Sequence, residues 1–466
     1  MLRRTAPLDP ALEPIREKVI AGQRLTRDDG LMLYRSRDIF TVGELANVVR
    51  ERLHGRRAYY NINRHINYTN YCVLRCKFCS FYRQMPKGGA PGAGRGARQP
   101  SETSALETSS PAALLEPAAP HVHDDNGGYE YSLDQIFDVA VEAAEQGATE
   151  VHIVGGLHPT LPFQFYLDMC RGIRQRAPRL HIKAFTAIEI VHFTRIARPR
   201  LSIEEVLTQL RAAGLDSLPG GGAEIFDDRV HDEAFKNKVG EKHWFDVHRA
   251  AHKLGIPTNA TMLYGHVETI DERITHMIKL RELQDEALAR MSNVECRMSN
   301  EQAIGSLEDG NRPANSTFDL RHSAFQCCIP LSFIPDGSAL AHLPGPTGLD
   351  DLRTLAVARL MLDNFPHIKA FWIMQSPKLS QVALNWGVDD FDGTVIWYDI
   401  TKREGRGTNR QELSVDQICR LIREAGCEPV ERDTFYRPVA RARDQGPRDQ
   451  GTEGPRDKGI KGAQQA

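Results

Sequence analysis

Three cysteines carry the most chemically specific pattern in the chain. Cys72, Cys76 and Cys79 have the spacing C-x3-C-x2-C and directly follow a strand-like run. Three thiolates on one loop suit a cubane iron–sulfur cluster in which one iron keeps no protein ligand. An open iron indicates a small-molecule ligand, so the pattern predicts an active site and designates the three cysteines as metal ligands.

Other chemistries remain open for these thiols. A structural zinc site needs a fourth Cys or His; His65 is a conceivable one, but it lies upstream and no second cysteine pair follows. A ferredoxin-type electron carrier supplies four cysteines to a cluster. Unligated thiols are a further alternative. The odd total of nine cysteines argues against a disulfide framework, and we expect the scattered six to pack as small apolar residues.

The elements that position this loop alternate between strands and helices, which predicts an α/β fold, a parallel (β/α)8 TIM-type barrel. Two of the predicted strands are weak, the fourth especially. The predicted strands are 60–69, 150–154, 181–185, 217–218, 258–263, 325–333, 367–374 and 393–398. The predicted helices are 133–146, 162–176, 203–213, 244–254, 272–286 and 350–364.

The barrel is predicted over residues 58–440, after an N-terminal helical segment, 1–57, in which Thr41 and Glu44 have capping-box spacing. Two low-complexity insertions are expected to be disordered. Residues 84–130 are rich in Gly, Ala, Pro and Ser, and 287–323 contain a short internal repeat. The tail, 441–466, repeats polar units and is expected to be disordered as well.

Further candidate residues follow the predicted strands, at the end where such barrels place their active sites. Each has a plainer alternative: a glycine pair is a turn, an acidic residue a helix start, and a lone histidine a structural group. The candidate cofactor-binding residues are Phe78, Gly155, Gly156, Glu189, Gly221, Glu224 and Asn259. Arg64, His65 and His266 are candidates for contact with a substrate carboxylate, and Asp390 and Asp392 for ligand contact from the eighth strand.

The composition of the chain limits the classes of partner and the cellular compartments that we expect for it. The formal net charge of −2 gives no basic field for nucleic acid. No apolar run approaches the ~20 residues of a membrane span, and the N-terminus does not read as a secretory signal. We therefore expect a cytoplasmic protein.

The cysteine loop, with Phe78 just before its last cysteine, resembles the signature of radical S-adenosylmethionine (SAM) enzymes. The resemblance implies a [4Fe–4S] cluster whose fourth iron binds the amino and carboxylate groups of SAM. It also implies a reductase, flavodoxin or ferredoxin as electron donor. In that superfamily, a glycine pair like Gly155-Gly156 lets the backbone approach the methionine amino group.

Within the superfamily, several stretches look closest to aminofutalosine synthases, enzymes of the futalosine route to menaquinone; they include 63–70, 155–162, 182–187, 218–226 and 259–266. That similarity implies transfer of the 5′-deoxyadenosyl radical to an aryl enolpyruvyl ether, 3-[(1-carboxyvinyl)oxy]benzoate. The products would be 6-amino-6-deoxyfutalosine, methionine and bicarbonate, with SAM as co-substrate. A dehypoxanthine futalosine cyclase and an F0 synthase are the related alternatives. A non-catalytic metal-binding protein is the remote one.

Overall fold

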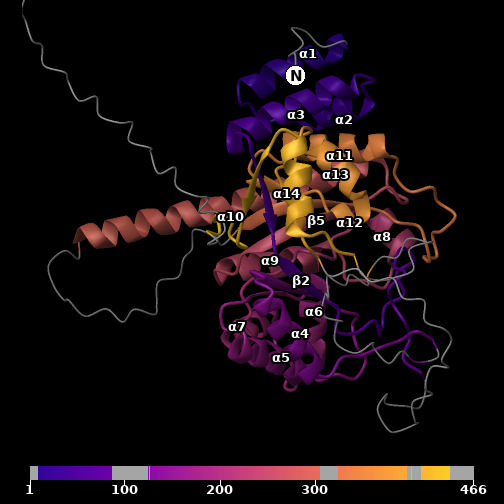
Figure 1. Ribbon diagram of the computed structural model, residues 1–466, viewed down its shortest axis with the longest axis vertical. Helices are drawn as coiled ribbons and strands as arrows, with labels where there is room; N and C mark the ends of the chain where they lie inside the picture. Colours follow the sequence, from indigo (N-terminus) through magenta and orange to yellow (C-terminus); the bar gives the residue numbers. More distant parts are fainter. Residues whose placement is uncertain are drawn as a thin grey trace, which may run out of the picture.

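The computed structural model describes residues 9–86, 124, 126–304, 324–395, 400 and 411–440. Its N-terminal part is helical, as predicted, and Figure 1 shows these helices stacked together on one side of the body. They are η1 (Pro10–Leu12), α1 (Glu13–Ile20), α2 (Arg27–Arg35) and α3 (Ile39–His54). The expected Thr41–Glu44 capping box is wrong, because α3 begins earlier. Asp38 is the N-cap, and its carboxylate accepts the backbone N–H of Thr41 at 3.1 Å.

Parallel strands form the centre of the molecule in three short sheets with the orders β8-β1-β9, β2-β3-β4 and β5-β6-β7. Hydrogen-bonded bridges continue from sheet to sheet through 183–217, 218–258 and 369–390. The strands are β1 (Arg57–Asn61), β2 (Asn63–Ile66), β3 (Glu150–Ile153), β4 (His181–Ala184), β5 (Thr258–Tyr264), β6 (Phe325–Ser332), β7 (His367–Ile368), β8 (Asp390–Gly393) and β9 (Glu428–Glu431).

The predicted first strand is divided in two, and this division closes the ring. β1 pairs with β8 on one side, whereas β2 pairs with β3 on the other. β9 pairs with β1 beside it, and this strand had not been predicted. The result is a closed parallel barrel, with the weak fourth strand reduced to isolated bridges at Ser217 and Leu218.

Helices cover the outside of the barrel. Several begin with a capping box in which a Ser or Thr and a residue three positions later satisfy each other's backbone, as in Ser132–Gln135 before α4. The helices are α4 (Leu133–Glu145), α5 (Phe163–Arg176), α6 (Ala187–Ile196), α7 (Ile203–Ala213), α8 (Asp228–Ala234), α9 (Glu241–Lys253), α10 (Ile270–Ile304), α11 (Gly348–Met361), α12 (Trp372–Gln375), α13 (Pro377–Ala383) and α14 (Val415–Glu424).

Two predicted strands differ from the structure. The apolar run 367–374 is a strand only as far as Ile368, because Trp372–Gln375 form α12; a short apolar run does not distinguish a strand from a buried helix. The eighth strand is 390–393, earlier than the predicted 393–398, of which 396–399 lie outside the described residues.

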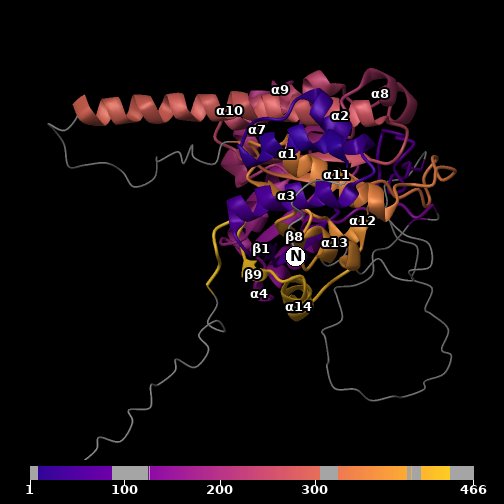
Figure 2. The same cartoon turned by 90° about the horizontal axis from the view of Figure 1, so that it is seen from above.

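The predicted insertion 287–323 also differs. Helix α10 continues through its first part to Ile304, since no Gly or Pro interrupts the sequence before Gly305. Figures 1 and 2 both show the end of α10 projecting from the body. Residues 305–323, 441–466 and most of 84–130 lie outside the described residues. None of the described helices combines the length and apolar character that a bilayer crossing requires.

Candidate functional site

Two adjoining cavities open at the C-terminal ends of the barrel strands. The thiol cavity has a volume of about 180 Å³ and is lined by Cys72, Cys76 and Cys79 together with the Gly155-Gly156 pair. The barrel cavity has a volume of about 220 Å³ and extends between the strands. The two cavities share Phe78, Cys79, Val154, Thr186, Gly222, Glu224 and Ile400. The cysteine loop therefore lies where a group bound to it would face the barrel interior.

The cysteine loop is held by backbone hydrogen bonds from several elements. The backbone N–H of Val73 donates to the carbonyl of Leu157 at 2.9 Å, and that of Lys77 donates to the carbonyl of Ala234 at 2.8 Å. The Cys72 sulfur accepts the N–H of Leu157 at 3.3 Å and that of Leu74 at 3.4 Å. Such N–H donors favour the thiolate form that a metal requires.

Burial opposes that form, because it raises the pKa of Cys72 and Cys79 and brings that of Cys76 to about 12. Thiolates here thus need a compensating positive charge. Lys238 supplies one from the protein. It lines the thiol cavity, and its ammonium lies 5.2 Å from the centre of the Phe78 ring.

Lys238 is paired with Glu224, and both side chains are less than a tenth exposed. Burial lowers the pKa of Lys238, but the Glu224 carboxylate together with Cys76 and Cys79 outweighs burial and holds that pKa above its usual value. Sequence reasoning missed Lys238, because it lies in the irregular segment after α8 and belongs to no motif. Its approach to Phe78 exists only in the folded chain.

Glu189 connects three strand ends beside the thiol cavity. Its carboxylate accepts hydrogen bonds from the backbone N–H and hydroxyl of Thr186 at 2.7 and 2.9 Å, the Tyr68 hydroxyl at 2.9 Å and the Gly155 N–H at 3.2 Å. Burial nevertheless raises the pKa of Glu189 to about 7. The helix-start and site interpretations are therefore compatible, because the residue closes the α6 capping box and also lines the cavity.

Contacts within the protein are enough to require glycine at two positions of the site. A Cβ at Gly156 would lie 2.2 Å from the backbone oxygen of Tyr71, in the chain that leads into the cysteine loop. At Gly220, where φ is +82°, a Cβ would lie 1.9 Å from the backbone oxygen of Asn259. Gly221, by contrast, lines the barrel cavity. Close approach of backbone to backbone is thus sufficient to explain Gly156 and Gly220.

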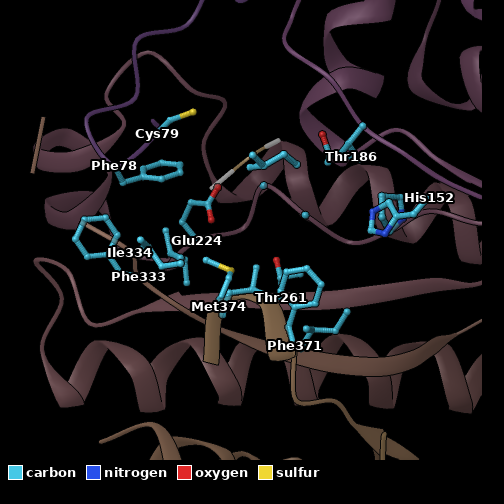
Figure 3. Close-up of a pocket in the computed structure, with 18 of the residues that line it drawn as sticks. Phe78, Cys79, His152, Thr186, Glu224, Thr261, Phe333, Ile334, Phe371 and Met374 are labelled. Atoms are coloured by element: carbon cyan, nitrogen blue, oxygen red, sulfur yellow. The ribbon is translucent and has the colours of Figure 1, made fainter. Parts of the chain in front are cut away.

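The barrel cavity has apolar walls and a polar floor. Its walls are formed largely by side chains of β5, β6 and the segment after β7, including Leu263, Ile329, Leu331, Phe333, Phe371 and Met374. His65, His152, Lys369 and Asp392 line the cavity from β2, β3, the end of β7 and β8, and we call these four polar residues the floor. Figure 3 shows Cys79 and Phe78 on one side of this cavity and His152 on the other, with Glu224, Thr261 and Met374 between them.

Four predicted residues do not line either cavity. One of them, Asp390, is buried on β8 and accepts a hydrogen bond from Arg432 at 2.7 Å. Arg64 faces α4, with its guanidinium 3.8 Å from the Glu142 carboxylate. The imidazole Nε2 of His266 bonds to the carbonyl of Leu263 at 3.0 Å, and its ring lies beside Glu268. Asn259 is buried on β5 two residues before Thr261, which does line the barrel cavity.

A further buried group lies at the opposite end of the barrel. His54, His367 and Asp389 place their ligand atoms within 4.8 Å of one another. Asp389 is already paired with Arg359 and accepts a hydrogen bond from His367 at 2.6 Å. The Arg359 guanidinium already supplies the positive charge that a metal ion would bring. This group is therefore a complete ion-pair network.

Comparison with known proteins agrees with this geometry. The model of the radical SAM superfamily matches residues 66–280, and that of the CofH/MqnC C-terminal region matches 322–444. Aminodeoxyfutalosine synthase of Thermus thermophilus is 41% identical over 92% of this chain and 96% of its own. The enzyme of that name from Streptomyces coelicolor is 34% identical over 91% of this chain and 92% of its own.

One relative with another name is less similar to this chain than these two enzymes. Cyclic dehypoxanthine futalosine synthase of Streptomyces coelicolor is 30% identical over 91% of this chain and 88% of its own. Among solved structures, methylornithine synthase gives a TM-score of 0.55 at 14% identity, covering 89% of this chain and 97% of its own. The FeFe-hydrogenase maturase HydG from Carboxydothermus hydrogenoformans gives 0.57 at 15%, covering 92% and 81%. These two likenesses concern the fold alone.

Proposed function

The chain belongs to the radical SAM superfamily, and from that membership we propose that it catalyses the aminodeoxyfutalosine synthase reaction. In this reaction the adenosyl C5′ of SAM becomes bonded to the vinyl carbon of 3-[(1-carboxyvinyl)oxy]benzoate. Rearrangement onto the aromatic ring, return of one electron and loss of the enolpyruvyl carboxylate, which leaves with water as bicarbonate, give 6-amino-6-deoxyfutalosine, while methionine is released. The observation that carries the proposal is the 41% identity, over nearly the full length of both chains, to an enzyme of that name.

The described residues fit the cluster and the nucleotide that this reaction needs. Cys72, Cys76 and Cys79 line one cavity, whose lining contains no fourth cysteine and no histidine among the described residues. That donor set suits a cluster with one open iron better than zinc. We propose that these cysteines hold a [4Fe–4S] cluster, and that Gly155, Gly156, Glu189 and Lys238 surround SAM beside it. When bound and reduced, the cluster supplies the electron that cleaves SAM to methionine and the 5′-deoxyadenosyl radical.

The chain's own residues then have three tasks. Apolar side chains, such as Phe333 and Phe371, exclude water and other quenchers from the barrel cavity. The Lys238–Glu224 pair places one positive charge beside the thiolates without adding net charge to the cavity. The polar floor offers donors to an anionic substrate. Radical addition requires no general base, so the absence of a catalytic triad from the described lining is expected.

The proposal also covers the electron donor, the domain organisation and the cellular compartment. A reductase, flavodoxin or ferredoxin would deliver the electron to the cysteine loop, on which Val73, Arg75 and Lys77 are exposed. The barrel domain would span 58–440, with 1–57 as a helical extension. Cytoplasmic placement belongs to the same proposal, because the cluster requires a reducing compartment.

The test is product analysis under anoxic conditions. Protein reconstituted with iron and sulfide is incubated with SAM, reductant and the benzoate ether. We expect methionine and a nucleoside adduct of the benzoate in equal amounts. Release of 5′-deoxyadenosine with intact benzoate would contradict the synthase assignment and favour a hydrogen-abstracting relative such as the cyclic dehypoxanthine futalosine synthases. Uptake of zinc alone would refute the cluster itself.

A further inference from the structure

We propose that Lys369, with His65 and His152, forms a carboxylate-binding subsite at the floor of the barrel cavity. This subsite would hold the ring carboxylate of the substrate and direct its enolpyruvyl end toward Cys79. The inference rests on the proposed function for the identity of the substrate. The subsite itself rests on the charge, burial and position of the floor residues.

Charge is the first argument. Among the described residues that line the barrel cavity, Lys369 alone is a lysine or arginine. Its side chain is 6% exposed, and its ammonium lies 2.7 Å from Oδ1 of Asp392. An ammonium has three donors, and this contact uses one of them. A carboxylate that enters the cavity from the open side can therefore reach a buried cation without displacing the existing ion pair.

Asp392 supplies a second argument. It lines the same cavity with a φ of +70°, and its Oδ2 atom is buried without a hydrogen-bond partner. A buried acceptor that lacks a donor is costly, so such an atom at a cavity indicates a ligand or a proton. Burial raises the pKa of Asp392, which favours the proton. A proton shared between Oδ2 of Asp392 and the incoming carboxylate would satisfy this atom, while Lys369 keeps its contact with Oδ1.

The two histidines complete the floor with neutral donors. Burial lowers the pKa of His65 to about 3 and that of His152 well below its usual value, so both rings are neutral near pH 7. Their ring centres lie 4.4 Å apart, and the centre of the Phe371 ring lies 6.3 Å from that of His65. A neutral imidazole carries one N–H. His152 can therefore donate a hydrogen bond, beside His65 and an aromatic wall on which a benzoate ring can pack.

Position is the last argument. In Figure 3, His152 and Cys79 lie on opposite sides of the cavity, and the Cys79 side is shared with the thiol cavity. The substrate carries its ring carboxylate and its enolpyruvyl ether on different ring carbons. A carboxylate fixed at the floor thus leaves the vinyl carbon free to face the thiol cavity, where C5′ of SAM would be presented. Positioning of this kind is a large part of what a radical enzyme contributes.

The experiment compares two substrates, the benzoate ether and the phenyl enolpyruvyl ether, which lacks the ring carboxylate. For the reconstituted wild-type enzyme we expect kcat/KM to favour the benzoate ether by at least about 100-fold, because a site with buried polar groups rejects an analogue that leaves them unpaired. Lys369→Met should abolish this preference, mainly by raising KM for the benzoate ether. Lys369→Arg should restore part of it. Cluster absorption and a cooperative thermal melt verify that each variant is loaded and folded.

The controls separate a binding role from a structural one. Lys183 is an equally buried lysine on β4, in a different sheet from Lys369, but it pairs with Glu150 at 2.9 Å and does not line the cavity. Lys183→Met should keep the wild-type preference even if its stability falls. Should Lys369→Met fail to fold, His152→Leu keeps the test valid, with an expected loss of about 10-fold in the preference.

An unchanged preference in the Lys369 or His152 variants would overturn the subsite while leaving the synthase assignment intact. A wild-type enzyme that uses both ethers equally well would do the same. If the wild type forms no adduct from the benzoate ether, the proposed function fails first, and the subsite assignment fails with it.

Discussion

The two ends of the barrel use the same buried residue types for opposite purposes. At the closed end, where the strands begin, charged groups are paired with one another. Asp390 accepts from Arg432 at 2.7 Å and from the Tyr436 hydroxyl at 2.5 Å, and Glu150 accepts from Lys183 at 2.9 Å. Lys369 lies level with Asp390, and His65 lies level with Lys183, yet both face the barrel cavity. The thiols at the open end face the thiol cavity. A buried charge thus indicates a ligand only when the protein leaves part of its bonding capacity toward a cavity.

This difference gives each end its own expected mutational response. Residues at the closed end hold the strands in register. Their replacement should lower the free energy of unfolding but leave turnover unchanged in the protein that still folds. Open-end residues are surrounded by space, so their loss should reduce chemistry more than stability. Substitutions at the two ends can therefore be told apart by measuring turnover and the free energy of unfolding.

Replacement of a cluster ligand should eliminate turnover. Cys76→Ala removes one of three proposed iron ligands, and we expect loss of the visible iron–sulfur absorption and of adduct formation. The matched control is Cys327→Ala, which removes a buried thiol from β6 that lines neither cavity. It should retain full cluster content and activity, at a cost of about 1 kcal/mol in unfolding free energy. If Cys76→Ala kept its cluster, Cys76 would not be a necessary iron ligand. The expected difference between the two ends of the barrel would then be contradicted.

Removal of a closed-end cation should mainly affect stability. Arg359 is fully buried and paired with Asp389. Arg359→Met leaves that carboxylate without its cation, and we expect a loss of about 3–5 kcal/mol in unfolding free energy, measured by denaturant titration. In the folded fraction, KM and cluster content should stay unchanged. The double variant Arg359→Met, Asp389→Leu should recover part of the loss, and a change in KM would place this network in the active site.

Two glycines with similar backbone angles should respond differently to alanine. Gly220, at the open end, has a φ of +82°, and a Cβ there would lie 1.9 Å from the backbone oxygen of Asn259. Gly426, at the closed end, has a φ of +79° and no heavy atom within 4 Å of such a Cβ. We expect Gly426→Ala to cost about 1 kcal/mol, from backbone strain alone, and Gly220→Ala to cost roughly 3 kcal/mol. Equal costs would mean that the strand ends move apart easily.

The smallest effect is a change in pH dependence at the closed end. Burial lowers the pKa of His181 to about 4, whereas the unfolded residue titrates near its ordinary value of about 6.5. The folded protein therefore binds fewer protons, and its stability falls as the pH falls from about 6.5 to about 4. His181→Asn should reduce the slope of unfolding free energy against pH by up to about 1.4 kcal/mol per pH unit. A slope equal to the wild type would show that His181 is already protonated in the folded state.

The sequence predicted the elements whose patterns are local. Strands β3 to β6 and helix α7 lie within two residues of their predicted ranges, because apolar periodicity and helix caps are read from neighbouring residues. Strand β9 was missed, since its pairing with β1 depends on a contact between residues more than 370 positions apart in the sequence. Asp390 and Asp392 precede the predicted eighth strand, 393–398, whereas in the structure both lie within β8.

The site was predictable only where a motif carried it. The cysteine spacing is local, and so is the glycine pair that follows β3. Lys238, His152 and Lys369 belong to no motif, and they reach the cavities only after α8, β3 and β7 have taken their places. For His152 and Lys369, the sequence did offer one signal, the alternation of inward-facing and outward-facing residues along a strand. Both are inward-facing positions in a closed barrel, where polar side chains are uncommon unless paired or functional.

The central claim, that C5′ of SAM ends up bonded to the substrate, is tested most directly by an isotope. Reconstituted enzyme is supplied with reductant, the benzoate ether and SAM labelled with ¹³C at C5′, and the products are followed by NMR. The account predicts that the label appears in a methylene carbon bonded to a second carbon, in an amount equal to the methionine released. A label found only in the methyl group of free 5′-deoxyadenosine, with the benzoate unchanged, would contradict it.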